Sequence, residues 1–299
     1  MYNIFLLLCQ TMLQQFLING LITGLLYAVA SLGFALVYNT TRIFHIALAV
    51  LYVAASYFFW QFVTWHVTPL ISFLIAVLLT AVLSLGIEKS VYFPLFRLKS
   101  SLNVVLVSSI GVFTILTNLI AMYWGNETKT FSSEIGNVFT LGEIIITGKQ
   151  VLQLFASVAV IAGFFILLNF SRTGLHIKAI RDDAELYQVT GFSLINIRSI
   201  AFLLSGGMIA FASCLTAWDT GMDPYVGMPI LLNAIVALII GGTGRFESCI
   251  IGGISLGIIQ ALVVWQWSAQ WQEAITFVIL LLFLFIRPQG FIGEKSRVV

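Results

Sequence analysis

Long apolar runs separated by short polar segments follow one another along almost the whole chain. A helix that crosses a membrane needs about 20 apolar residues, because roughly 30 Å of hydrocarbon is crossed at about 1.5 Å per residue. Nine runs meet or approach this length and predict membrane-spanning helices. They cover residues 13–38, 44–65, 70–87, 103–124, 151–170, 200–218, 225–240, 249–265 and 274–286.

This pattern predicts an all-α fold, a polytopic transmembrane helical bundle with about nine spans, within a range of eight to ten. A glycine-rich break at residues 241–244 shortens the runs around it, so we expect the last three spans to be short, interrupted helices. Residues 1–299 are expected to form a single transmembrane domain.

Composition identifies the bilayer as the solvent for this fold. Hydrophobic residues make up 60% of the chain and charged residues only 9%, whereas soluble domains carry about 25% charged residues. The first ten residues contain no Lys or Arg, so they lack the basic start of a cleavable signal peptide, and the first apolar run is expected to remain. Cys9, Cys214 and Cys249 lie far apart and predict neither a disulfide framework nor a metal site.

The distribution of Lys and Arg predicts the orientation, because cytoplasmic loops retain basic residues. With nine spans and the N-terminus outside, the inner loops hold twelve of the fourteen Lys and Arg residues, and only Lys129 and Lys149 lie outside. We therefore expect a multi-pass membrane protein with an external N-terminus and a cytoplasmic C-terminus.

Two loops between the predicted spans carry structural signals of their own. The outer loop 125–150 contains Gly-Asn pairs and a β-branched stretch, which predict a short external hairpin. In the inner segment 172–194, apolar residues recur at steps of three and four from Ile177 to Tyr187, while charged residues occupy the other faces. This spacing predicts a short amphipathic helix that ends at Gly191. It serves either as a surface connection or as a docking helix for a cytoplasmic motor.

Short motifs follow one another in a specific order along nearly the whole chain, outside the loop 125–150. They are Asn19-Gly20, Gly24, Tyr27-Ala28, Tyr38, Gly174, Ala179, Ala184, Gly191, the run 201–207 (Ala-Phe-Leu-Leu-Ser-Gly-Gly), 224–227, 241–244, Gly252-Gly253, Gly257 and 287–293. Together they resemble the branched-chain amino-acid ABC permease family, which includes importers of urea and related amides, and residues 172–207 resemble its coupling loop and following helix. One departure is His-Ile-Ala-Leu-Ala at residues 45–49, where the family often has Asn-Phe-Ala-His-Gly. The resemblance therefore does not determine which solute is transported.

This resemblance implies a permease subunit of an ATP-binding-cassette importer in a bacterial-type plasma (inner) membrane. The subunit would form the translocation path for a small polar solute: a branched-chain or other amino acid, urea or an amide. The implied partners are a second permease subunit or a second copy of this chain, two cytoplasmic ATPase subunits and an extracytoplasmic solute-binding protein, in a lipid bilayer and without nucleic acid. ATP and Mg would sit on the partner subunits, with no cofactor in this chain. The residues implied in ATPase coupling are Lys178, Ala179, Arg181, Asp182, Asp183, Ala184, Glu185 and Gly191.

Uncharged polar residues within the spans are the candidates for the translocation path. Asn19, Thr23 and Asn233 are expected to face the bundle interior, because a neutral amide or hydroxyl is cheaper to bury against protein than to expose to lipid. The pairs Gly20-xxx-Gly24 and Gly253-xxx-Gly257 are expected to let helices pack closely. The full set of path candidates is Asn19, Thr23, His45, Asn118, Ser205 and Asn233.

Several activities are disfavoured by motifs that the sequence lacks. It contains no G-x-x-x-x-G-K-[ST] motif for ATP, no HExxH pattern, and no Asp, Glu or Lys inside the predicted spans for a proton-coupled carrier. We therefore expect a non-enzymatic subunit, with no catalytic residue and no metal ligand. A secondary carrier or facilitator that works without ATP and a membrane-embedded scaffold are the alternatives that the sequence leaves open.

Overall fold

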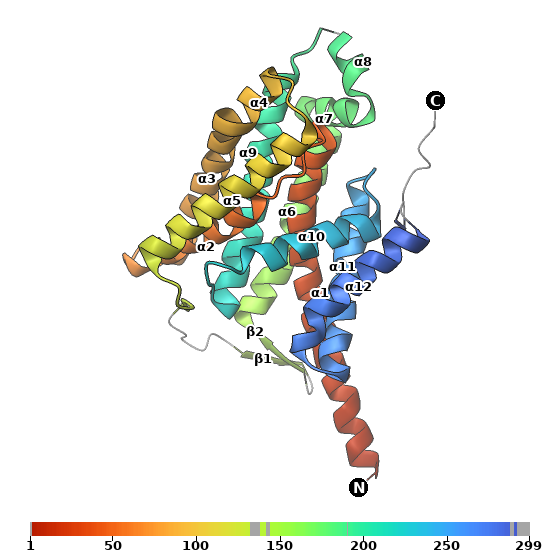
Figure 1. Ribbon diagram of the computed structural model, residues 1–299. Coiled ribbons are helices and arrows are strands. Elements are labelled where there is room, and N and C mark those ends of the chain that lie inside the picture. Colours follow the sequence, from red (N-terminus) through yellow and green to blue (C-terminus); the bar gives the residue numbers. More distant parts are fainter. Residues whose placement is uncertain (1, 132–137, 142–143, 190, 288–289, 292–299) are drawn as a thin grey trace. The chain divides into compact units, whose positions relative to one another are not determined.

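The computed structural model describes residues 2–131, 138–141, 144–189, 191–287 and 290–291, and most of them are helical (Figure 1). Two short strands, β1 (Val138–Leu141) and β2 (Ile144–Thr147), are the remaining regular elements of these residues. The helices are α1 (Tyr2–Thr41), α2 (Leu48–Thr64), α3 (Pro69–Ile87), the π-helix η1 (Glu88–Tyr92), α4 (Phe93–Arg97), α5 (Leu102–Trp124), α6 (Gly148–Phe170), α7 (Arg172–Asp182), α8 (Ala184–Val189), α9 (Leu194–Thr220), α10 (Gly227–Gly241), α11 (Glu247–Gln266), the 3₁₀ turn η2 (Ala269–Trp271) and α12 (Gln272–Ile286).

Each of the nine predicted spans coincides with a helix, which confirms the all-α polytopic fold class. Helices α2 and α10, with 17 and 15 residues, are shorter than the roughly 20 residues that a full crossing needs. The count of nine spans is therefore not established. Of the last three helices, α10 and α12 have 15 residues each and are as short as expected, whereas α11 has 20. The segments of the described chain that are long and apolar enough to cross a membrane number seven: Met12–Thr41, Pro69–Arg97, Leu102–Trp124, Gly148–Phe170, Leu194–Thr220, Glu247–Gln266 and Ala269–Ile286.

The chain forms two compact units. Unit 1 comprises Met1–Ser31, Ser132–Val158 and Leu232–Val299, and unit 2 comprises Leu32–Phe131 and Ala159–Leu231. Helices α1, α6 and α10 each contribute residues to both units.

In unit 1, α1 and α11 pack through their glycine pairs. A Cβ atom added to Gly20 would lie 2.6 Å from Cβ of Ala261 and 2.8 Å from the Gly257 carbonyl oxygen, and one added to Gly24 would lie 2.9 Å from the Gly253 carbonyl oxygen. Such distances leave no room for a side chain, so the backbones approach directly. The predicted packing role of both glycine pairs is confirmed, and the two pairs pack against each other.

The glycine-rich break of unit 1 is a turn between two helices. Helix α10 ends at Gly241, and Gly242 adopts a φ of +114°, which a residue with a side chain rarely adopts. The Ser248 hydroxyl on α11 donates hydrogen bonds to the carbonyl oxygens of Gly242 and Arg245. These bonds hold α10 and α11 as a hairpin.

Strands β1 and β2 also belong to unit 1 and pair antiparallel, with Val138 opposite Thr147 and Leu141 opposite Ile144. The side chain of Gln15 on α1 donates to the Ile145 carbonyl at 2.8 Å and accepts from the Ile145 N–H at 3.0 Å. This two-bond contact fixes β2 to α1. The strands lie in the loop for which a hairpin was predicted, while residues 132–137 and 142–143 of that loop lie outside the described residues.

Unit 2 is built around α2, α3 and α9, which pack on one another. The Ser84 hydroxyl on α3 donates to the Phe202 carbonyl on α9 at 2.7 Å. A Cβ atom on Gly206, one turn later on α9, would lie 3.2 Å from Cα of Ala81, so these two helices also meet through small residues. The unit carries the segment predicted to couple to ATPases, α7 and α8, between the long helices α6 and α9.

Candidate functional site

A network of neutral amide side chains joins three helices of unit 1. Its centre is Gln260 on α11, whose Nε2 donates to Asn233 Oδ1 on α10 at 3.1 Å and to Thr276 Oγ1 on α12 at 2.7 Å. Its Oε1 accepts from Gln272 Nε2 at 2.9 Å. Gln260, Asn233 and Thr276 are buried, so these bonds replace water as hydrogen-bond partner. Gln260 is thereby held in one orientation and positions its neighbours.

A second group of amides gathers at Asn19 on α1. Asn19 Oδ1 lies 3.4 Å from Gln15 Nε2 and 3.4 Å from Gln150 Nε2 on α6, within reach of both donors. The Thr23 hydroxyl, one turn further along α1, donates to the Asn19 carbonyl oxygen at 2.9 Å. These contacts use the carboxamide oxygen of Asn19 and leave its NH₂ group without a protein partner among the described residues.

A pocket of about 180 Å³ lies between α1, α11 and the start of α12 in unit 1. Amide and hydroxyl groups on its wall offer both donors and acceptors, and none of its lining residues is charged. In an apolar surrounding, a solute with a net charge would lack a counter-charge here, whereas a neutral or zwitterionic solute would find hydrogen-bond partners. The pocket is lined by Phe16, Asn19, Gly20, Thr23, Gly257, Gln260, Ala261, Val264 and Gln272.

Three of the six predicted path residues thus belong to one site. Asn19 and Thr23 line the pocket, and Asn233 is one bond away through Gln260. The sequence analysis did not select Gln260, Gln272 or Thr276. For Gln260 the signal was available, since it is an uncharged amide inside an apolar run, as Asn233 is.

The other three predicted path residues, His45, Asn118 and Ser205, belong to unit 2. Asn118 is exposed on α5 and donates to the Thr114 carbonyl of its own helix at 2.8 Å. Ser205 is buried on α9. Neither lies in the amide network of unit 1.

His45 lies in a buried polar cluster of unit 2. Its Nδ1 is 2.8 Å from Tyr92 Oη, and the Tyr92 hydroxyl donates to Ser109 Oγ at 2.7 Å. Ser109 Oγ also accepts from the Ala47 N–H at 2.9 Å, just before α2. The ring of Phe202 packs edge-on against His45 at 5.1 Å between centroids. The cluster therefore anchors the start of α2 to η1, α5 and α9, and His45 has a packing role in it.

The predicted coupling helix is divided into two helices, α7 and α8, which is a correction to the single helix expected. Ser171 caps α7 by accepting from the Gly174 N–H at 2.9 Å. Asp183 ends α7 in an extended conformation, and its Oδ1 accepts from the N–H groups of Glu185 and Leu186, both at 2.9 Å. An aspartate that caps a new helix in this way starts α8, so the helical direction changes at Asp183.

The apolar face expected for this segment is present on both helices. Ile177 and Ile180 on α7 and Tyr187 on α8 are buried, and Ala184 is partly buried. The Tyr187 hydroxyl lies 3.1 Å from His176 Nδ1, and burial raises the pKa of Tyr187, so the phenol stays protonated. These contacts fold α8 back onto α7.

The remaining predicted coupling residues lie on the outside of α7 and α8. Ala179, Asp182, Asp183, Glu185 and Gly191 are exposed, and Lys178 and Arg181 are partly exposed. Arg181 pairs with Asp182 at 2.7 Å, and Lys178 Nζ donates to Asn169 Oδ1 at 2.6 Å. Gly191 has a φ of +83°, in keeping with its predicted role at a helix end.

Large apolar side chains are exposed beside these charges, at Leu175 on α7, Leu186 and Val189 on α8, and Phe192. A surface of this composition is suited to contact with another protein. Across the part of the chain that the structure describes, no three His, Cys, Asp or Glu side chains come together as a metal site would require.

Comparison with known proteins gives the family of the chain. Residues 16–284 match the model of the family described as "Branched-chain amino acid transport system / permease component". The high-affinity branched-chain amino acid transport system permease proteins BraD of Pseudomonas aeruginosa and LivH of Escherichia coli are 26% and 25% identical to the chain, and each alignment covers 95% of this chain and 96% of the relative.

More distant similarities agree with this assignment. The ribose import permease protein RbsC of Haemophilus influenzae is 23% identical over 64% of this chain and 61% of its own length. Among solved structures, PsaBC from Streptococcus pneumoniae in complex with Fab has a TM-score of 0.51 at 13% identity, with 92% of each chain covered, which is a likeness of fold alone. The chain belongs to the permease component family of branched-chain amino acid transport systems.

Proposed function

We propose that this chain is the membrane-spanning permease subunit of an ATP-binding-cassette importer and carries a small polar solute across the plasma membrane. The observation that supports this most is the pocket of neutral amides between apolar helices of unit 1. Hydrogen bonds between membrane helices add only about 0.6 kcal/mol each, so stability is a weak reason for burying several amides here, and solute passage supplies a stronger one.

The same pocket bears on the class of solute. Its uncharged donors and acceptors suit a solute without net charge, which includes a zwitterionic amino acid, urea and small amides. Family membership favours a branched-chain or other amino acid among these. Nothing in the pocket favours a proton-coupled or ATP-independent carrier.

For the energy source, we propose that α7 and α8 dock on the cytoplasmic ATPases, through Lys178, Ala179 and residues 181–185, of which all except Ala184 are charged. Their outer surface combines charges with exposed apolar side chains, while a buried face fixes them to the rest of unit 2. ATP and Mg would be bound by the ATPase subunits. Closure of the ATPases would move α7 and α8, and the long helices on either side would carry this movement to the solute path.

The proposed assembly contains a second permease subunit or a second copy of this chain, two ATPases and an external solute-binding protein. The twelve-to-two distribution of Lys and Arg favours an external N-terminus and a cytoplasmic C-terminus. Cysteine labelling from each side tests this orientation. A cysteine at position 183 should react only from the cytoplasm, and one at position 127 only from outside.

Uptake by the reconstituted complex tests the proposed function. The proteoliposomes contain the permease, its ATPases and the solute-binding protein, and they are tested with labelled branched-chain amino acids and with urea. The transported solute should accumulate only when both ATP and the ATPases are present. Equilibration of any of these solutes by the permease alone, at the same rate with and without ATP, would favour a facilitator and contradict the proposal.

A further inference from the structure

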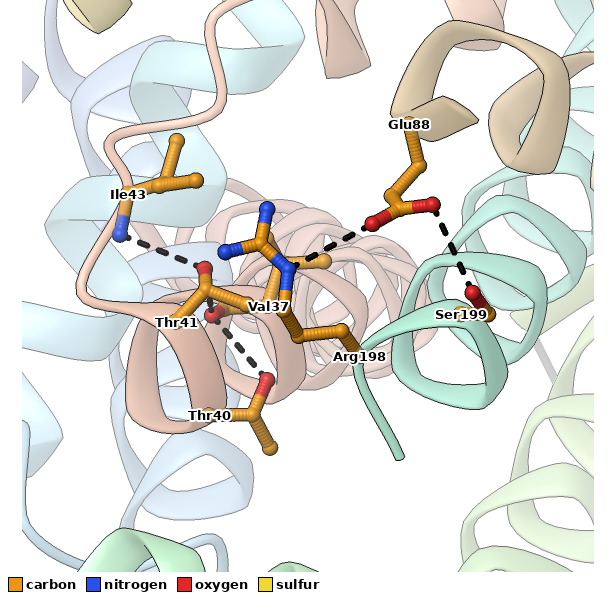
Figure 2. A network of polar contacts seen from close by, with 7 residues as sticks. All are labelled: Val37, Thr40, Thr41, Ile43, Glu88, Arg198 and Ser199. Carbon is orange, nitrogen blue, oxygen red and sulfur yellow. Dashed lines mark hydrogen bonds and ion pairs between the residues drawn. The ribbon is translucent and has the colours of Figure 1, made fainter. Parts of the chain in front are cut away.

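A buried ion pair joins η1 to α9 within unit 2 (Figure 2). Glu88 is the first residue of η1, and Arg198 lies in the second turn of α9. Arg198 Nε is 3.4 Å from Glu88 Oε1, and their side chains are only 5% and 1% exposed. The Ser199 hydroxyl lies 3.4 Å from the other carboxylate oxygen, Oε2. The sequence analysis placed Arg198 in an inner loop, whereas the structure buries it inside a helix pair.

The stability of the fold does not by itself explain why two charged side chains are buried against each other. Removing two charges from water costs more than their attraction usually returns, and apolar side chains of similar size often stabilise a protein at least as well. A function in which the contact between Glu88 and Arg198 changes would explain why the pair is present.

The geometry of the pair is incomplete in this structure. Charge-assisted bonds between guanidinium and carboxylate groups are normally about 2.7–2.9 Å long and often bidentate, whereas the one bond here is 3.4 Å. Arg198 Nη2 is buried and has no hydrogen-bond partner among the described residues. In Figure 2 the dashed line to Glu88 starts from Nε, and no dashed line joins a terminal nitrogen of Arg198 to the residues drawn. A rotation of the guanidinium or a shift of either helix would complete the bonding.

The place of the pair connects the coupling segment to the spans. Helix α9 begins at Leu194, soon after α8 ends at Val189, and α7 contacts α9 directly. On the other side, η1 continues α3, which packs along α9. A π-helix is a rare local widening of a helix that is frequently found at functional sites. The guanidinium also lies 4.5 Å from the ring centroid of Phe96 on α4, which follows η1.

We propose that Glu88 and Arg198 form a latch that transmits movement of α7 and α8, through the start of α9, to α3. The latch rests on the proposed function. In one state of the transport cycle the pair is loose, as in this structure, and in the other the guanidinium and carboxylate engage fully. Neither residue touches the solute, so both are positioning residues that determine how much solute moves for each ATP hydrolysed.

The first test is Glu88→Gln in the reconstituted complex, with uptake and ATP hydrolysis measured together. The amide keeps the size of the side chain but removes its charge, so the tight state is lost. Solute uptake per ATP should fall roughly 2- to 30-fold, the range of coupling effects at residues away from both ligands, while assembly with the ATPases stays normal. Glu247→Gln, the same exchange at an exposed position of α11, is the matched control and should leave the ratio unchanged.

The second test separates a latch from a structural pair and covers the case in which Glu88→Gln impairs folding. The double variant Glu88→Leu with Arg198→Met removes both charges and fills the same space, so it should assemble and resist heat like the natural protein. The double variant should still take up less solute per ATP hydrolysed than the natural protein. If this ratio equals that of the natural protein, the latch is wrong and the proposed function stands. If the natural complex shows no ATP-driven uptake, the proposed function fails, and the latch fails with it.

Discussion

Replacing Gln260 by Leu should affect both stability and transport, because this side chain makes three hydrogen bonds at the centre of the amide network. Hydrogen bonds between membrane helices contribute about 0.6 kcal/mol each, so their loss should lower the free energy of unfolding by about 2 kcal/mol. Thr276 keeps its bond to the Gln272 carbonyl within α12, so its hydroxyl still has an acceptor.

The effect on transport follows from the loss of orientation. Without Gln260, the amide of Gln272, which lines the pocket, is no longer held and can turn away from the solute. A solute that loses one hydrogen bond of about 1–1.5 kcal/mol binds roughly 5- to 12-fold more weakly. The concentration of solute that half-saturates uptake should rise by this factor.

The assay combines heat unfolding of the purified complex with uptake by proteoliposomes over a range of solute concentrations. Gln266→Leu serves as the control, because Gln266 is exposed at the end of the same helix and outside the network. It should change neither quantity. A Gln260→Leu variant that loses stability but keeps its half-saturating concentration would refute the idea that the network faces the solute.

Three further substitutions test other parts of the account. Gly257→Leu should force α1 and α11 apart and cost about 1–3 kcal/mol in stability measured by heat unfolding, whereas Gly163→Leu, at a position with free space, should not. Asp183→Ala removes the cap of α8 and should lower the stability of this helix by about 1 kcal/mol. Hydrogen exchange of residues 184–189 should then become faster, and unchanged exchange would contradict the capping role. Ala184→Arg should reduce co-purification of the ATPases while the permease still inserts, and undiminished co-purification would contradict the coupling assignment.

The sequence was sufficient for features that depend on local pattern. Long apolar runs predict helices because the bilayer requires every backbone group to be bonded within the segment. The glycine pairs at residues 20–24 and 253–257 predict close packing because small residues repeat on one face. Asn19, Thr23 and Asn233 were selected because polar groups in apolar runs need protein partners, and each has a hydrogen-bond contact in the structure. Their place on a translocation path stays a prediction.

Features that depend on which segments meet were not predictable in this way. Gln260 matters because it bonds to both Gln272 and Asn233, and no spacing rule pairs α10 with α11 and α12. Glu88 and Arg198 are separated by 110 residues, so their burial against each other has no local signal. The break at Asp183 was missed because the apolar spacing continues across it, while the cap that divides the helices depends on one side-chain rotamer.

The most direct test of the central claim is solute protection of a cysteine placed in the amide pocket. Thr23→Cys, in a variant whose three natural cysteines are replaced, should react with a membrane-impermeant thiol reagent, and the transported solute should slow this reaction in the assembled complex. The rate should also change when the ATPases bind ATP. A cysteine at this position that never reacts from either side, or reacts at a rate that neither solute nor ATP alters, would show that the pocket is not on the translocation path.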